Sequence, residues 1–236
     1  MENLKSKVII VTGASSGIGE STVRLLAQKG AKVVLAARRT NLMQEIVNDI
    51  KQEGGEAAFI EAEVSSPEDM KRLAQFAIEQ YGRIDVLVNN AGYQQLSLLN
   101  ELKIEEWNKA IDVNIKGVLY AIAAVLPTMR EQKSGHIINI SSVMGHKVIP
   151  TTTVYSATKS AVRAISEGLR QEESPESNIR STIISPGMTA TGVLADYAEY
   201  PSLSPAAVAR AIAYAINEPE DTGVNEILLR PTLQSL

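Results

Sequence analysis

The stretch KVIIVTGASSGIG, residues 7–19, decides the fold. Four apolar residues at positions 8–11 run without polar alternation into a turn with three glycines, and a helical pattern follows over residues 17–28. An unbroken apolar run is typical of a parallel strand covered by helices on both faces. Glycines at this spacing could form only a tight connection, but a turn between a first strand and a helix favours an anion site at the helix N-terminus. The predicted dinucleotide-binding residues are Gly13, Ser15, Ser16, Gly17, Ile18 and Gly19.

Short apolar runs and helical segments alternate along the rest of the chain. The pattern predicts strands at 7–12, 32–36, 57–61, 86–89, 136–140, 179–184 and 226–229, and helices at 17–28, 41–52, 67–80, 104–131, 153–171 and 205–217. Because strand–helix–strand crossovers are right-handed, this order predicts a doubly wound α/β fold of Rossmann type. We expect a single domain over residues 1–236, with a mostly parallel seven-stranded sheet and helices on both faces. Residues 188–204 lack periodicity and are predicted to form a substrate loop.

Composition narrows the class of protein. The net charge of −4 and the scattered Lys and Arg residues argue against a nucleic-acid partner. The chain has no cysteine, which fits a reducing compartment, and its first apolar run is too short for a signal peptide or a membrane span. We therefore expect a cytoplasmic protein without a membrane partner. Neither His136 nor His146 has acidic residues at metal-ligand spacing, so no metal is predicted, and His146 is a candidate for lining the substrate mouth.

Two arginines follow the second predicted strand. In folds that bind dinucleotides, side chains at this point, about twenty residues after the glycine turn, contact the adenosine ribose. An acidic residue there would bind the ribose hydroxyls, whereas Arg38 and Arg39 match a 2′-phosphate. NADP(H) is therefore favoured and NAD(H) remains possible. The alternative is that both arginines are solvated charges at the end of a strand.

Tyr155 and Lys159 share one face of the predicted helix 153–171, because they are four residues apart. A neighbouring ammonium group favours the phenolate and so lowers the pKa of a tyrosine, which makes it a usable acid or base. The alternative is a tyrosine at the surface of an amphipathic helix with a lysine nearby.

With these motifs the sequence resembles the short-chain dehydrogenase/reductase family. The resemblance rests on the ordered motifs TGASSGIG (12–19), NNAG (89–92), NIKG (114–117), ISS (140–142), YSATK (155–159) and PG (186–187). It implies a catalytic tetrad of Asn114, Ser142, Tyr155 and Lys159. Tyr155 would exchange a proton with the substrate oxygen, Ser142 would hold that oxygen, Lys159 would bind the nicotinamide ribose and lower the pKa of Tyr155, and Asn114 would hold a water in a proton relay. Ser141 is equally placed by composition, and only the family spacing selects Ser142.

The resemblance also implies further cofactor contacts. Glu63 and Val64 would meet the adenine, where relatives usually carry Asp. Asn90 would lie along a ribose and Thr189 at the nicotinamide amide, although both fit turn roles equally well. Many relatives that prefer NADP carry a basic residue where this chain has Ser16, so Arg38 and Arg39 are the main evidence for that cofactor.

The predicted activity is an NADP(H)-dependent oxidoreductase that acts on CH–OH donors, transferring a hydride between the cofactor and a small or medium ketone, aldehyde or secondary alcohol. Alternatives are a 3-oxoacyl thioester reductase, a sugar or hydroxy-acid dehydrogenase, and a dinucleotide sensor without activity. The substrate pocket is expected at residues 93–96, 143–149 and 188–200, after the strands. Helices 104–131 and 153–171 resemble those through which relatives assemble, so a homo-oligomer, a dimer or tetramer, is predicted.

Overall fold

The computed structural model describes residues 2–191 and 200–233. Its centre is one seven-stranded sheet in which every strand pair is parallel, in the order β3-β2-β1-β4-β5-β6-β7. The strands are β1 (Val8–Thr12), β2 (Lys32–Ala37), β3 (Glu56–Glu61), β4 (Val86–Asn89), β5 (Gly135–Ile140), β6 (Ile179–Pro186) and β7 (Glu226–Leu229). The predicted doubly wound α/β fold is confirmed, and the sheet is fully parallel.

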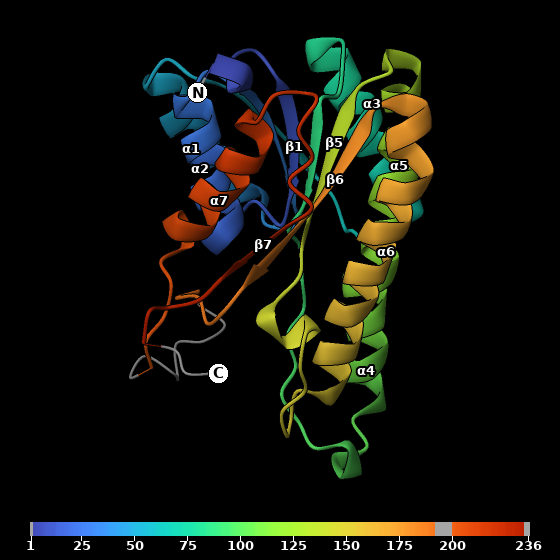
Figure 1. The fold of residues 1–236 in the computed structure, drawn as a ribbon. Helices are drawn as coiled ribbons and strands as arrows, with labels where there is room; N and C mark the ends of the chain where they lie inside the picture. The colour runs from blue at the N-terminus through green and yellow to red at the C-terminus, as the bar shows by residue number, and fades with distance from the viewer. Residues whose placement is uncertain (1, 192–199, 234–236) are drawn as a thin grey trace.

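Helices cover both faces of the sheet (Figure 1). One layer holds α1 (Gly17–Gln28), α2 (Thr40–Gln52) and α7 (Pro205–Asn217), and the other holds α3 (Pro67–Tyr81), α5 (Gly117–Gln132) and α6 (Thr153–Ser177). Each layer has its own buried apolar core against the sheet. This arrangement explains why β1 and β4 are buried at every position and show no polar alternation.

Local chemistry sets the start of two of these helices. Ser66 and Ser204 precede prolines, and their hydroxyl oxygens accept the backbone N–H groups of Asp69 and Ala207, each at 3.2 Å. A serine cap followed by a first-turn proline satisfies a free N–H group and sets the entering dihedral angle. The structure confirms helix starts at Pro67 and Pro205, as the sequence predicts.

The helix predicted over residues 104–131 has an interruption that sequence spacing does not reveal. It consists of α4 (Ile104–Ile111), a π-helical segment η3 (Asp112–Lys116) and α5. By length and composition the stretch Ile104–Gln132 would be able to cross a membrane. Within it, Val125 and Met129 of α5 are buried in the core over the sheet, whereas Ile104 and Ile111 of α4 are exposed.

The strand order reverses between β1 and β4, and this reversal positions the site. On one side of it the chain winds outward through β2 and β3, and on the other through β5, β6 and β7. Loops that leave β1 and β4 therefore diverge and open a crevice at the carboxyl ends of the strands. Short 3₁₀ segments at that edge are η2 (Leu99–Glu101) and η4 (Val143–Gly145), with η1 (Glu2–Leu4) near the N-terminus.

Candidate active site

The glycine turn at the end of β1 is packed too tightly for side chains. A Cβ atom added to Gly13 would lie 2.8 Å from the Ala91 Cα, and one added to Gly19 would lie 2.4 Å from the Gly13 carbonyl oxygen. Gly13 and Gly17 also have φ values of +64° and +58°, which favour glycine. The turn therefore brings bare backbone to the N-terminus of α1, as a diphosphate site requires.

Thr12 and Asn90 hold this turn in place. Thr12 Oγ1 accepts the N–H groups of Asn90 and Ala91, each at 3.1 Å. Asn90 Nδ2 donates to the carbonyl oxygens of Thr12 at 2.9 Å and Gly13 at 3.2 Å. The turn role of Asn90 is thus what the structure shows, while its place along a ribose stays a prediction. Sequence reasoning missed Thr12, although a threonine directly before the first glycine was a usable signal.

Both arginines after β2 reach polar groups of the predicted adenosine site. Arg39 donates to Ser15 Oγ, from Nε at 3.2 Å and from Nη2 at 3.0 Å, and to Ser16 Oγ at 2.6 Å. Arg38 is largely exposed and pairs with Glu63 at 3.3 Å. Arg39 is thus joined to the two serines of the glycine turn and Arg38 to Glu63, while the binding of a 2′-phosphate there stays a prediction.

The side chain of Val64 packs in the core, and its predicted contact with the adenine stays a prediction. Its side chain is 8% exposed and belongs to the apolar core, where it lies close to Gly117. A Cβ added to Gly117 would come within 2.9 Å of Val64 Cγ2. A side chain packed in this way is not free to face an adenine ring, so any contact there would use the backbone of Val64. The side chain of Ile18, another predicted cofactor residue, is partly buried and packs against the apolar core between the sheet and the layer of α1, α2 and α7.

Ser142 and Tyr155 lie side by side at the carboxyl edge of the sheet. The Ser142 hydroxyl lies near enough to the Tyr155 hydroxyl to lower its pKa, and it donates to the Pro186 carbonyl oxygen at 3.5 Å. It accepts the Met144 N–H at 3.1 Å as the N-cap of η4. Ser141, which composition could not distinguish from Ser142, instead donates to the Lys159 carbonyl oxygen at 3.0 Å. The structure therefore separates a serine at the tyrosine from a serine used to pack α6.

Lys159 is buried beside Tyr155, but the expected effect on the tyrosine pKa is not seen. Its Nζ lies 5.7 Å from the centre of the Tyr155 ring and donates to the Ile140 carbonyl oxygen at 2.8 Å. Burial raises the pKa of the Tyr155 hydroxyl, and the neighbouring Ser142 hydroxyl only partly offsets it. Burial also lowers the pKa of Lys159 from 10.5 to about 8. The pKa of Tyr155 is thus raised in the protein alone, and its lowering by Lys159 stays a prediction.

Asn114 lies inside the π-helical segment and is 1% exposed. Its Oδ1 accepts the Tyr93 N–H at 2.7 Å, and its Nδ2 donates to the Tyr93 carbonyl oxygen at 2.8 Å and to Thr158 Oγ1 at 3.0 Å. Both amide hydrogens are therefore committed to holding the loop after β4 against α6. The proton relay that the resemblance implies stays a prediction, and Thr158 is a partner that sequence reasoning missed.

The predicted substrate loops surround this group of side chains in part. Gln95 and Ser97 are buried and hydrogen-bond each other, and the Ser97 N–H donates to the Thr151 carbonyl oxygen at 2.9 Å. Thr189 is 5% exposed, and its Oγ1 donates to the Gly187 carbonyl oxygen at 3.0 Å. Residues 192–199 of the predicted loop lie outside the described part of the chain. A Cβ added to Gly17 would lie 3.1 Å from Thr191 Cγ2, so the start of this loop borders the glycine turn.

The arrangement fits a dinucleotide. Bare backbone at the N-terminus of α1 suits the diphosphate, Arg38 and Arg39 suit an adenosine phosphate, and Tyr155 and Lys159 stand at the other end of the crevice. Among the described residues no group of three His, Cys, Asp or Glu side chains is placed to hold a metal ion. A phenol with its proton, a neighbouring hydroxyl and a nearby amine can together transfer a proton to or from a substrate oxygen.

Comparisons with known proteins agree with this geometry. Residues 7–201 match the model of the family described as short chain dehydrogenase. An oxidoreductase of Staphylococcus saprophyticus, itself uncharacterized, is 50% identical over an alignment 248 positions long that covers both chains completely. An alcohol dehydrogenase from the archaeon Thermococcus sibiricus, complexed with 5-hydroxy-NADP, is 30% identical with a TM-score of 0.91 over 98% of this chain and 99% of that one. The closed form of a serine dehydrogenase complexed with NADP+ is also 30% identical, with a TM-score of 0.90 over 97% and 96% of the two chains.

Proposed function

Because this chain belongs to the short-chain dehydrogenase family and is an oxidoreductase by that membership, we propose that it is an NADP(H)-dependent carbonyl reductase or alcohol dehydrogenase with Tyr155 as its general acid and base. The observation that carries the proposal is the position of Lys159 Nζ, 5.7 Å from the centre of the Tyr155 ring, with the Ser142 hydroxyl near enough to the phenol to lower its pKa. A site that only senses a dinucleotide has no use for this group.

The side chains divide the work of carbonyl reduction. Tyr155 keeps its proton at neutral pH because burial raises its pKa, so it donates that proton to the carbonyl oxygen. Ser142 holds the same oxygen by a hydrogen bond and stabilises the charge that develops on it. Lys159 binds the nicotinamide ribose beside the phenol. NADPH, when bound, supplies the hydride.

NADP(H) is the preferred cofactor in this proposal. Three of the solved structures that resemble the chain contain NADP or a derivative of it. Within this chain, Arg39 lies against both serines of the glycine turn, and Arg38 is exposed beside it. A guanidinium group binds a phosphate through paired hydrogen bonds, which NADH would not offer at that position.

The proposed substrate is a small or medium neutral ketone, aldehyde or secondary alcohol. Apolar side chains such as Leu96 and Val148 are exposed on the loops after β4 and β5. The serine dehydrogenase among the similar structures makes a hydroxy acid the second candidate. A panel of carbonyls and alcohols followed at the nicotinamide absorbance band distinguishes the two classes.

The mechanism is tested by Tyr155→Phe. The variant should lose about 10²- to 10⁴-fold in kcat, the typical contribution of a general acid, while NADPH still raises its melting temperature. Ser142→Ala should lose about 10²- to 10³-fold, whereas Ser141→Ala, its matched control, should keep kcat near that of the wild type. An undiminished rate in Tyr155→Phe would contradict the proposed mechanism.

We also propose that the protein acts in the cytoplasm as a homo-oligomer. Ile104, Ile111 and Leu119 are exposed on the helical stretch formed by α4, η3 and α5, at 56%, 40% and 43% of their surfaces. Their spacing places them along one side of the helix, a pattern that favours helix pairing between subunits. A sedimentation profile that shows only a 25.5 kDa monomer would contradict this assembly.

A further inference from the structure

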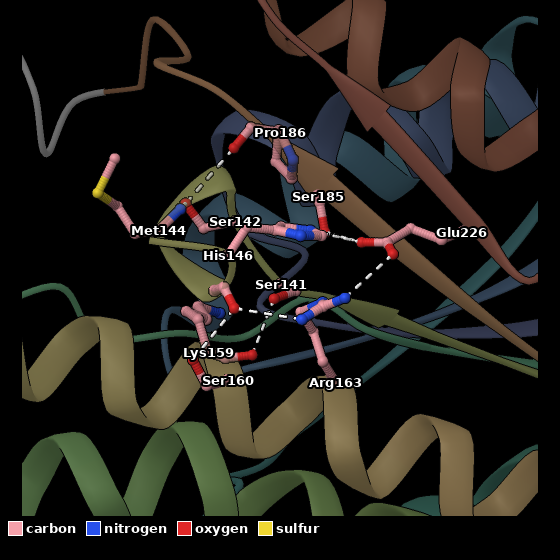
Figure 2. A network of polar contacts seen from close by, with 11 residues as sticks. Ser141, Ser142, Met144, His146, Lys159, Ser160, Arg163, Ser185, Pro186 and Glu226 are labelled. Atoms are coloured by element: carbon pink, nitrogen blue, oxygen red, sulfur yellow. Dashed lines mark hydrogen bonds and ion pairs between the residues drawn. The ribbon is translucent and has the colours of Figure 1, made fainter. Parts of the chain in front are cut away.

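A polar network behind the catalytic serine ends on Glu226, the first residue of β7 (Figure 2). Glu226 Oε1 accepts Ser185 Oγ at 2.8 Å and lies 2.7 Å from His146 Nε2. Glu226 Oε2 accepts a longer hydrogen bond of 3.5 Å from Arg163 Nη2. Three elements far apart in the sequence, the turn after β5, the end of β6 and α6, therefore converge on one carboxylate.

His146 takes a different place from the one that the sequence suggests. It is a candidate for the substrate mouth by position, but its ring points toward Glu226 and Ser185 (Figure 2). Burial alone would raise the pKa of Glu226, but the hydrogen bonds from Ser185, His146 and Arg163 more than offset it, so its pKa lies below the usual value. Glu226 is thus a carboxylate at neutral pH and accepts hydrogen bonds only, which assigns a proton to His146 Nε2.

Gly145, the residue before His146, is also hydrogen-bonded to α6. The Gly145 carbonyl oxygen accepts Ser160 Oγ at 3.1 Å and Arg163 Nη1 at 3.4 Å. A Cβ added to Gly145 would lie 2.8 Å from Ser141 Oγ and 3.0 Å from the Lys159 carbonyl oxygen. The end of the turn is therefore held in three ways: by hydrogen bonds to the Gly145 carbonyl oxygen, by close packing of the Gly145 backbone, and by the contact of the His146 side chain with Glu226.

Only η4 separates this anchored end from Ser142. The Gly145 N–H donates to the Ser142 carbonyl oxygen at 2.9 Å, and the His146 N–H donates to the Val143 carbonyl oxygen at 3.1 Å. The Met144 N–H inside the turn donates to the Ser142 hydroxyl oxygen itself. A turn closed by three hydrogen bonds moves as a unit, so a shift of His146 carries the Ser142 hydroxyl with it.

We infer that Glu226 is a positioning residue for the reaction: through His146 it fixes the turn that sets the Ser142 hydroxyl beside Tyr155. This inference rests on the proposed function, because it assumes that Ser142 holds the substrate oxygen. It gives a role to the last strand, which carries no residue of the predicted tetrad. A displacement of about 1 Å at a reacting group can lower a rate about a hundredfold, so a small loosening of the turn suffices for a large effect.

The test compares variants that remove or keep the anchor. Glu226→Gln keeps the shape but removes the charge, and it should lower kcat about tenfold with the KM for NADPH unchanged. His146→Asn is too short to reach Glu226 and should lower kcat similarly. His146→Gln keeps an N–H donor at about the reach of Nε2 and should restore most of the rate. Glu173→Gln is the control, since it breaks another ion pair, between the buried Glu173 and the exposed Arg130, that holds no part of the site.

Hydrogen exchange gives a readout that does not depend on turnover. The Met144 amide should exchange faster in Glu226→Gln and in His146→Asn than in the wild type or Glu173→Gln, because its acceptor is no longer held. Unchanged kcat together with unchanged Met144 exchange in a folded Glu226→Gln protein would overturn the inference. A wild type that reduces no carbonyl, with Met144 exchange still dependent on Glu226, would instead contradict the proposed function and leave the anchoring of the turn supported.

Discussion

Arg39 Nη2 donates a hydrogen bond of 2.6 Å to Ser16 Oγ and so joins the end of β2 to the glycine turn. Relatives that prefer NADP often carry a basic residue at the position of Ser16, and this chain does not. In the structure the guanidinium group of Arg39 reaches the turn from the end of β2 instead. This guanidinium group is held by two serines of the glycine turn, and the proposed function places the 2′-phosphate of NADP(H) against it.

Arg39→Ala is therefore expected to weaken NADPH binding about tenfold or more while changing NADH binding little. The reason is that a hydrogen bond to a charged group contributes about 1.5–3 kcal/mol. Kd values for both dinucleotides, measured by titration of the purified protein, check the prediction. Arg170→Ala is a suitable control, because Arg170 pairs with Glu167 on the surface of α6 and should affect neither Kd. Equal losses for NADPH and NADH in Arg39→Ala would contradict a 2′-phosphate role.

The fold was predictable from sequence because the strands and the helix starts each have a local sequence pattern. Unbroken apolar runs such as Val8–Val11 mark strands buried on two faces, and Ser-Pro pairs mark helix starts such as Pro67. The π-helical segment around Asn114 was not predictable in this way. The side chain of Asn114 inside it hydrogen-bonds the backbone of Tyr93, which is remote in sequence and which no local pattern reports.

In the candidate site, too, local sequence patterns predicted some features, whereas features that depend on remote contacts were missed. Spacing alone placed Tyr155 and Lys159 on one helix face, and family order selected Ser142 over Ser141. The raised pKa of Tyr155 was not predicted, because it depends on how much protein encloses the hydroxyl, which no local pattern reports. The Glu226 anchor was missed for a similar reason: it joins a residue of the last strand to a turn eighty positions earlier.

Lys159 predicts a pH dependence of stability. Its pKa falls from 10.5 in the unfolded chain to about 8 in the folded protein, so between these values the unfolded state binds more protons. Below pH 8 the buried charge of Lys159 should therefore lower the free energy of unfolding by its full amount. As pH rises from 8 toward 10.5, the free energy of unfolding should increase again. A lowering from 10.5 to about 8 corresponds to about 3 kcal/mol.

Denaturant unfolding of the wild type and Lys159→Met over pH 7–10.5 measures this dependence, since methionine has a similar length and no charge. The wild type should gain stability relative to the variant as pH rises, and the gain should begin near pH 8. A difference between the two proteins that stays constant over this range would show that Lys159 has an ordinary pKa in the folded state.

Lys133 provides a test of backbone strain far from the site. It ends α5 with φ = +50°, a left-handed conformation that costs a residue with a side chain about 1–2 kcal/mol. Lys133→Gly should therefore raise the free energy of unfolding by about 0.5–1 kcal/mol, because the relief of strain exceeds the added entropy of the unfolded chain. Lys29→Gly is the matched control: Lys29 also ends a helix and is exposed, but its φ is −88°. That variant lacks strain to relieve and should lose stability by a similar amount, so chemical denaturation that shifts both variants in the same direction would contradict the argument.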